Sequence, residues 1–147
     1  MDFTVNKASI RDVSTVVPMA GCIWHSATFQ ELEADFSDMI EAEDAAVFLA
    51  FCGNVPCGFA QCSLRHDYVE GTHSSPVGYL EGIFVNPEYR KLGCASALLT
   101  ACESWARENG CTEFASDCEL TNTESLRFHL NVGFREANRI ICFTKSL

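Results

Sequence analysis

The pattern of hydrophobic and polar positions in the N-terminal third of the chain predicts one strand followed by two helices. Residues 3–7 alternate between the two kinds of position, which is typical of a strand. A helix start follows at Ser9, and Pro18 bends or ends that helix. A second helix begins at a capping box that opens at Thr28, and apolar residues recur at helical spacing as far as Ile40.

The rest of the chain alternates between strand and helix patterns. Apolar runs at 45–52 and 57–64 flank a Gly-Asn-Val-Pro turn and predict a β-hairpin. A run at 77–85 is apolar on both faces and predicts a central strand. Beyond it we expect a helix over about 89–109, a strand over 113–118, a helix from 121 to just before Gly133, and one or two closing strands within 134–145. This order, β-α-α-β-β-β-α-β-α-β, predicts a mixed α/β sheet that is partly covered on both faces.

Length and composition favour a single globular domain, residues 1–147. A chain of 147 residues is about one domain by the usual length relation. Its 48% hydrophobic residues exclude intrinsic disorder, which requires few apolar residues and a high net charge. No apolar run approaches the roughly 18–20 residues of a membrane span, and residues 1–7 hold no apolar signal segment. We therefore expect a soluble, cytoplasmic protein that does not bind membranes.

Acidic residues outnumber basic residues by 20 to 10, so the net charge is −10. Nucleic acids and anionic membrane surfaces are bound through Lys and Arg, and this charge disfavours both as partners. The segment 12–64 contains no Lys or Arg, although acidic residues are frequent within it. That segment either forms a solvated acidic surface or produces an electric field that concentrates a cationic ligand.

The nine cysteines form no C-x-x-C pair and show no zinc-finger spacing with the four histidines, so no metal site is expected. Most of them lie in apolar segments, where a thiol packs like a small hydrophobic residue. The pattern predicts buried free thiols in a reducing compartment. A disulfide between Cys52 and Cys57, across the predicted turn, stays open as an alternative.

The junction between the 77–85 strand and the following helix carries the most specific short motif. Arg90-x-x-Gly93-x-Ala95 opens the helix, and Gly93 permits a close approach of the backbone to a ligand. The free N–H groups and the dipole of a helix start bind anions, and Arg90 and Lys91 add positive charge. A pyrophosphate suits such a site, although the same pattern also occurs at helix starts that bind nothing. The motif is neither a Walker loop nor a G-x-G-x-x-G fingerprint.

This motif, the length and the element order resemble the GCN5-related N-acetyltransferase (GNAT) family over the whole chain. The resemblance implies an α/β fold with a mixed, mostly antiparallel central sheet of about six to seven strands, flanked by about four helices. It also implies acetyl-CoA as co-substrate, and the segment Asn122-x-x-Ser125-x-x-Phe128-His129-x-x-x-Gly133-Phe134 resembles the closing motif of the family. The implied cofactor-binding residues are Ile83, Phe84, Val85, Arg90, Lys91, Leu92, Gly93, Cys94, Ala95, Ser96, Asn122 and His129. The family commonly has a tyrosine as general acid at the position of His129, which is either that acid or a helix residue without a catalytic role.

Longer strings of residues narrow the resemblance to the aminoglycoside 6′-N-acetyltransferases. They cover 65–72, 75–85, 113–117 and 138–143. The implied substrate-binding residues are Trp24, His25, Tyr68, Glu81, Asp117 and Asn138. Two of these depart from the subfamily, because His25 precedes the position where a histidine is expected and Asn138 replaces an acidic residue. The subfamily also implies a homodimer whose C-terminal strands cross between subunits, which would cover the apolar run 140–143.

Glu81 and Asp117 are the candidate catalytic residues, because the attacking amine must lose a proton that a carboxylate accepts directly or through water. Glu81 lies within an apolar strand, where a carboxylate is costly unless paired, so it is alternatively a core acid bound to an internal arginine. Asp117 ends a strand at the edge where ligands of open α/β sheets bind, and it is alternatively a helix cap. Asp117 is the first choice as proton acceptor because water and substrate reach a strand end. Backbone N–H groups of 82–85 are candidates to stabilise the thioester oxygen.

Together these features predict an acetyl-CoA-dependent aminoglycoside 6′-N-acetyltransferase that acts on substrates of the kanamycin and tobramycin type and confers antibiotic resistance. A polycationic substrate suits a protein with a net charge of −10. Two alternatives remain, a GNAT enzyme that acetylates a polyamine or a protein amine, and a CoA-binding module without catalysis.

Overall fold

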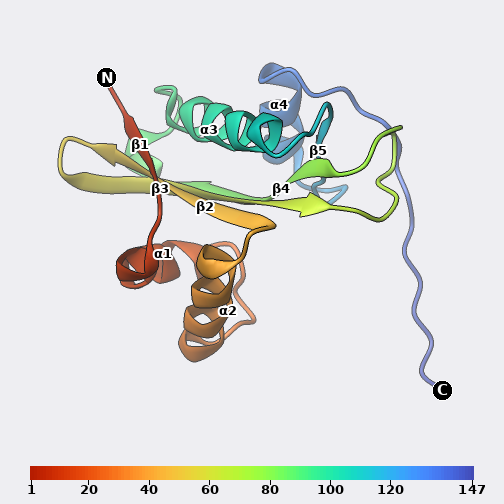
Figure 1. Ribbon diagram of the computed structural model, residues 1–147, viewed down its shortest axis with the longest axis horizontal. Coiled ribbons are helices and arrows are strands. Elements are labelled where there is room, and N and C mark those ends of the chain that lie inside the picture. Colours follow the sequence, from red (N-terminus) through yellow and green to blue (C-terminus); the bar gives the residue numbers. More distant parts are fainter.

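A five-stranded sheet, with its strands in the order β1-β2-β3-β4-β5, forms the centre of the computed structural model, which describes residues 1–147 (Figure 1). Neighbouring strands are antiparallel, except for β4 and β5, which are parallel. The strands are β1 Thr4–Lys7, β2 Ala45–Cys52, β3 Val55–Arg65, β4 Val77–Val85 and β5 Phe114–Ser116. The predicted α/β fold, the hairpin and the long apolar strand are thus confirmed.

The helices lie in two layers, one on each face of the sheet (Figure 1). α1 Val13–Ala20 and α2 Phe29–Glu41 cover one face, and α3 Cys94–Glu108 and α4 Thr123–Asn131 lie on the other. The cap predicted at Thr28 is present, because its hydroxyl accepts a hydrogen bond from the Glu31 N–H at 3.1 Å. Pro18 lies inside α1 instead of ending it. Short 3-10 turns at 10–12 and 87–89 precede α1 and α3.

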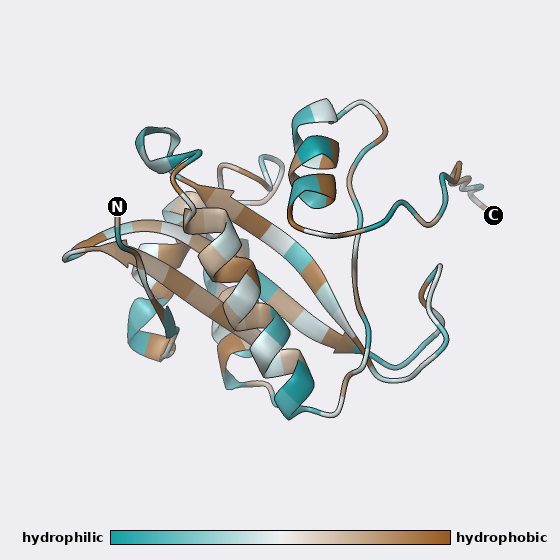
Figure 2. Cartoon of the chain, turned by 90° about the horizontal axis from the view of Figure 1, so that it is seen from above, coloured by the Kyte–Doolittle hydropathy of each residue, from teal (hydrophilic) through white to brown (hydrophobic).

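Each helical layer packs against one face of the sheet and forms a hydrophobic core there, and the residues of β2 contribute to both cores. Alternate residues of a strand point to opposite faces, so Phe48 and its alternate neighbours pack with α3, whereas Val47 and Leu49 pack with α1 and α2. All of residues 45–50 are buried, which explains a sequence that is apolar without interruption (Figure 2). The two cores therefore hold the sheet between the two helical layers.

The C-terminal segment differs from the prediction. Residues 134–147 form no strand and run away from the sheet, so the sheet has five strands instead of about six to seven (Figure 1). A strand forms only where a neighbour satisfies its backbone, and the outer edge of β5 pairs with no segment of this chain. Ile140, Ile141 and Phe143 are consequently 69%, 80% and 87% exposed.

The nine cysteines are all free thiols, so the disulfide left open between Cys52 and Cys57 is absent. Five of them are buried, as expected for thiols that pack as small hydrophobic residues. No helix combines the length and the apolar character that crossing a bilayer requires.

Candidate active site

A β-bulge in β4 places Glu81. Leu80 lies opposite Cys62 of β3 and Gly82 lies opposite Gln61, so Glu81 is an extra residue without a partner in the ladder. The bulge occurs where β5 ends, since the last pair between β4 and β5 is Leu80 with Ser116. A bulge bends its strand and redirects a side chain. Beyond Leu80 the two parallel strands therefore part, and β4 continues with one edge unpaired.

The Glu81 carboxylate is bound by Arg65 of β3. The Arg65 Nη2 lies 2.6 Å from Glu81 Oε1, and its Nε donates to Oε2 at 3.0 Å. The Ser63 hydroxyl also donates to Oε2. The glutamate side chain is 23% exposed and the arginine side chain 42%. The structure thus shows the paired arrangement that the sequence left as the alternative for Glu81, and the charge of this carboxylate is balanced within the protein.

Asp117 lies one residue beyond β5, and the Tyr79 hydroxyl donates a hydrogen bond to its Oδ2. No other side-chain hydrogen bond reaches Asp117, and its Oδ1 accepts none. It caps no helix, because the cap of α4 is Asn122. Asp117 is an exposed residue. The structure therefore leaves one oxygen of this carboxylate accessible at the point where β4 and β5 separate.

Trp24, in the connection between α1 and α2, packs directly on the backbone of β4. Its ring touches Gly82 so closely that a Cβ there would lie 2.6 Å from the ring edge. Phe36 and Phe59 hold the other side of the indole, with ring centroids 5.9 and 6.3 Å away. The half-buried indole thus forms an apolar wall one residue from Glu81. The adjacent His25 is exposed and forms no side-chain hydrogen bond or ion pair.

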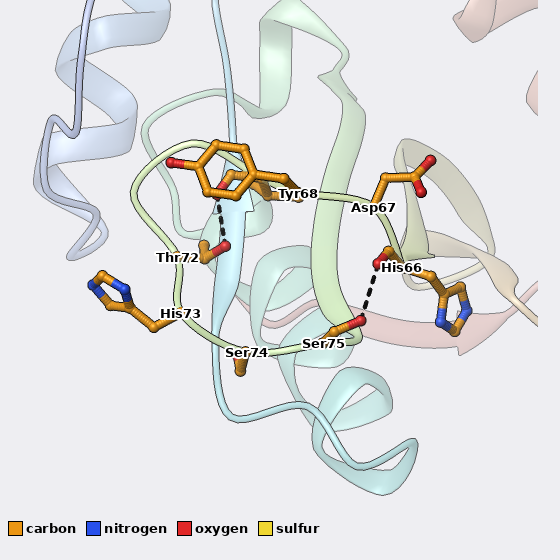
Figure 3. Close-up of a pocket in the computed structure, with 8 residues that line it drawn as sticks. His66, Asp67, Tyr68, Thr72, His73, Ser74 and Ser75 are labelled. Atoms are coloured by element: carbon orange, nitrogen blue, oxygen red, sulfur yellow. Dashed lines mark hydrogen bonds between the residues drawn. The ribbon is translucent and has the colours of Figure 1, made fainter.

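The loop between β3 and β4 forms a separate concave surface of about 360 Å³ (Figure 3). Tyr68, in this loop, is 77% exposed. The Asn138 side-chain amide donates to Glu70 of the loop at 3.0 Å, which ties the start of the C-terminal tail to it. The residues that line the concavity are His66, Asp67, Tyr68, Val69, Thr72, His73, Ser74 and Ser75. Tyr68 and Asn138 thus belong to the cluster around this loop. Glu81 and Asp117 lie elsewhere, Glu81 within β4 and Asp117 hydrogen-bonded to Tyr79 of the same strand.

The unpaired edge of β4 runs from the bulge to Val85. On its other edge, Ile83, Phe84 and Val85 pair with Ala60, Phe59 and Gly58 of β3. The edge toward β5 has no strand neighbour beyond Leu80, so its backbone groups are available to an extended ligand. This is the place where the sequence located a thioester-binding segment.

The loop after β4 is shaped for an anion. Gly93 caps α3 with φ +96°, in the left-handed region that favours glycine, and Lys91 also has a positive φ of 62°. The first N–H groups of α3, from Cys94 onward, have no acceptor within the helix. The Arg90 Nε donates to the Val85 carbonyl at 2.8 Å, which fastens the loop to the end of β4. The N-terminus of α3 therefore offers oriented donors next to the unpaired strand edge.

Among the remaining predicted loop residues, Cys94 differs in orientation. Its side chain is buried and its Sγ lies 3.8 Å from Sγ of Cys57, so only its backbone faces the loop. Burial raises the pKa of the Cys94 thiol to about 12. Leu92 and Ser96 are exposed and Ala95 is half-buried. The helix thus begins at Cys94 instead of about residue 89, because the backbone at Gly93 is not helical.

His129 lies in a chain of hydrogen bonds that links α4 to the end of β5. Its Nδ1 lies 2.7 Å from the Ser125 carbonyl, so Nδ1 is the donor in that bond. Its Nε2 lies 2.8 Å from the Ser116 hydroxyl, which is also 3.2 Å from the Leu80 carbonyl. Asn122 caps α4 by accepting from the Ser125 N–H. The structure therefore connects His129 to the last paired position of β4 and β5, close to where the strands part.

Comparison with known proteins agrees with this geometry. Residues 16–134 match the Acetyltransferase (GNAT) family. The chain belongs to this family. The expectation of a GNAT fold is thereby confirmed, with five strands in the sheet instead of the predicted six to seven.

Related acetyltransferases match three quarters or more of this GNAT chain. It is 45% identical to aminoglycoside N(6′)-acetyltransferase type 1 of Salmonella typhimurium over 76% of this chain and 77% of that protein. It is 35% identical to the protein of the same name from Stenotrophomonas maltophilia, over 98% and 94% of the two chains. The solved structure of AAC(6′)-Iy with a bisubstrate analogue, CoA-S-monomethyl-acetylneamine, has a TM-score of 0.95 at 35% identity and covers both chains fully.

Arg65, Ser63 and Tyr79 contact the two candidate acidic residues, Glu81 and Asp117, and the sequence patterns did not single them out. In the ladder Ser63 lies opposite Tyr79 and Arg65 lies opposite Val77, whereas Glu81 is the bulge residue without a partner. Cross-strand spacing alone therefore gives no signal for the Arg65–Glu81 pair, because the long arginine side chain reaches the glutamate only through the bulge. No group of three or more His, Cys, Asp or Glu side chains lies close enough together to hold a metal.

Proposed function

We propose that this acetyltransferase transfers the acetyl group of acetyl-CoA to the 6′-amine of an aminoglycoside antibiotic of the kanamycin and tobramycin type, and so confers resistance. The accessible Asp117 oxygen, at the point where β4 parts from β5, is the observation that carries the proposal. The relatives named as aminoglycoside N(6′)-acetyltransferases support the substrate class.

The two substrates are proposed to approach from opposite faces of the sheet. Leu80 packs in the core beneath α3, so its neighbours Tyr79 and, at the bulge, Glu81 face the layer of α1 and α2. The anion-binding start of α3 lies on the other face (Figure 1). The gap beyond the Leu80–Ser116 pair joins the faces, and an acyl group placed in it would meet an amine held at Asp117.

Acetyl-CoA is proposed to lie along the unpaired edge of β4, with its pyrophosphate at the N-terminus of α3. Backbone donors of 83–85 would bind the pantetheine portion in the manner of an added strand. N–H groups of 91–96, together with the charges of Arg90 and Lys91, would bind the phosphates. Asn122 and His129 would border the far side of the thioester from α4.

The reaction requires an uncharged amine, whereas the amines of the substrate are mostly protonated at neutral pH. Asp117 takes one proton from the ammonium, and the freed lone pair attacks the thioester carbonyl carbon. The C–N bond forms and the C–S bond breaks, so CoA leaves as a thiolate. The thiolate then takes the second proton that the nitrogen loses on becoming an amide, and Asp117 returns its proton to solvent.

The remaining predicted residues are proposed to bind the polycationic substrate. Trp24 would pack against a sugar ring beside β4, and Glu81, while paired with Arg65, would accept a further hydrogen bond from the substrate. Tyr68, His25 and Asn138 would lie at the periphery. Exposed acids of α2 add to the net charge of −10, which favours the approach of a polycation.

We also propose a homodimer in the cytoplasm. The outer edge of β5 is unpaired and the tail 134–147 exposes Ile140, Ile141 and Phe143, so the tail of a second copy would complete the sheet. Free cysteines suit a reducing compartment. Light scattering should give twice 16.2 kDa, and deletion of 134–147 should give a monomer. A full-length protein that is monomeric at working concentration would contradict the dimer.

The proposed function is tested by steady-state kinetics with acetyl-CoA and kanamycin, with the product located by NMR. We expect acetylation at the 6′-amine and none of an aminoglycoside that carries a hydroxyl group there. Spermidine and a lysine peptide serve as alternative acceptors, and Asp117→Asn as the variant control. Faster turnover with either alternative acceptor would favour a polyamine or protein acetyltransferase, and CoA binding without any turnover would favour a non-catalytic module.

A further inference from the structure

Tyr79 is the single side chain that fixes the orientation of Asp117. Asp117 follows the last residue of β5, so the strand ladder does not fix its carboxylate. The Tyr79 hydroxyl donates to Oδ2, and Oδ1 remains without a partner in the protein. A hydrogen bond to one oxygen of a carboxylate leaves the other to accept from a ligand. The position of the tyrosine thus determines which oxygen faces the substrate.

Tyr79 is itself held on every side. It lies in the middle of β4, between Ser63 of β3 and Ala115 of β5, and only 6% of the residue is exposed. The guanidinium carbon of Arg65 lies 3.4 Å from the centre of the Tyr79 ring. Two hydrogen bonds to Glu81 fix that guanidinium in turn. A continuous series of contacts therefore runs from Glu81 through Arg65 and Tyr79 to Asp117.

The hydroxyl of Tyr79 is protonated, and therefore a donor, at neutral pH. Burial, and then the hydrogen bond and charge of Asp117, raise the pKa of Tyr79 well above its ordinary value. A neutral tyrosine in this place contributes a hydrogen bond without adding charge to an acidic site. It therefore suits the support of a carboxylate better than a group that titrates near neutral pH.

We infer that Tyr79 is a positioning residue for the acetyl transfer, holding Oδ2 of Asp117 so that Oδ1 receives the proton of the substrate ammonium. This inference rests on the proposed function. Arg65 and Glu81 support the tyrosine ring, so the two acidic residues have different tasks. Asp117 accepts the proton, whereas Glu81 acts through Arg65 on the geometry of Asp117.

The test is Tyr79→Phe, which keeps the ring beneath Arg65 and removes only the hydroxyl. We expect kcat with kanamycin to fall about tenfold or more, the loss expected for one hydrogen bond to a charged group. The KM for acetyl-CoA should stay unchanged. In an Asp117→Asn background the same substitution should change kcat by less than about twofold, because the carboxylate that it positions is absent.

Two further variants separate positioning from a structural role. Tyr89→Phe is the matched control, since the Tyr89 hydroxyl makes no hydrogen bond in the structure and its ring packs against Phe3, with the ring centroids 6.4 Å apart, so the variant should retain wild-type kcat. Arg65→Met should lower kcat in the wild-type background and have little effect beside Asp117→Asn. If Tyr79→Phe folds poorly, Arg65→Met carries the same test.

The outcomes distinguish this inference from the proposed function. Wild-type enzyme that does not acetylate kanamycin overturns the proposed function and the inference with it. Wild-type turnover together with an undiminished Tyr79→Phe kcat overturns the inference alone. A loss of kcat that is equally large with and without Asp117 also overturns it, because the tyrosine would then act on the fold and not on this carboxylate.

Discussion

Gly93 offers a sharp test of the proposed phosphate site, because the structure separates two effects of its replacement. Its φ is +96°, and a Cβ added there would meet no atom within 4 Å. Gly93→Ala therefore creates no clash and costs only backbone strain, about 1–2 kcal/mol for an L-residue in the left-handed region. For a chain of this size, such a loss lowers Tm by about 2–8 °C.

The second effect concerns CoA. If the loop relieves the strain by changing its backbone angles, the N–H groups of the first turn of α3 no longer converge on the proposed phosphate position. Losing one hydrogen bond to a phosphate costs about 1.5–3 kcal/mol, which corresponds to a Kd for CoA that is about 10- to 100-fold higher. Gly93→Asp should weaken the binding of CoA further through charge repulsion. High salt should reduce the difference in Kd between the aspartate and alanine variants.

Gly110→Ala is the matched control. Gly110 has a φ of +85° and also meets no atom within 4 Å, but it follows the far end of α3, about 22 Å from Gly93 along the helix axis. Its Tm loss should resemble that of Gly93→Ala, whereas its Kd for CoA should equal that of the wild type. Calorimetric titration with CoA and thermal unfolding measure the two quantities. Equal Kd values for the two alanine variants would refute the assignment of the phosphate site.

Two other predictions follow from packing and burial. Gly82→Ala places a Cβ 2.6 Å from the Trp24 ring, so the indole must move. We expect a several-fold rise in the KM for kanamycin at an unchanged KM for acetyl-CoA. A KM for kanamycin equal to that of the wild type would contradict the role of Trp24. Burial raises the pKa of the Cys94 thiol to about 12, so iodoacetamide at about pH 8 should alkylate exposed Cys118 in the native protein and Cys94 only after unfolding. Peptide mass spectrometry reads both sites, and rapid native labelling of Cys94 would show that the start of α3 opens.

The sequence by itself determined the features that depend on neighbours along the chain. Apolar runs and alternation predicted all five strands within two residues of their observed bounds, and helical spacing with a capping box predicted α2. The motif Arg90-x-x-Gly93-x-Ala95 located the start of α3 within a few residues, although the left-handed conformation of Gly93 was not predicted. Asp117 was placed at a strand end for the same reason, because strand termination is a local property.

The fold decided the features that depend on contacts between distant segments. The sequence could not locate the bulge at Glu81, because a bulge exists only in the register between β3 and β4. Nor did it identify Arg65 as the partner of Glu81 or Tyr79 as the donor to Asp117, since those contacts join residues 16 and 38 positions apart.

The C-terminal tail shows that a strand pattern in the sequence does not by itself produce a strand. Its apolar run at 140–143 is typical of a strand, yet residues 134–147 form none within this chain. A strand pattern specifies which residues would be buried, whereas a sheet forms only where another backbone supplies the missing hydrogen bonds. Local pattern thus determined which segments are able to form strands, and tertiary pairing decided which of them do.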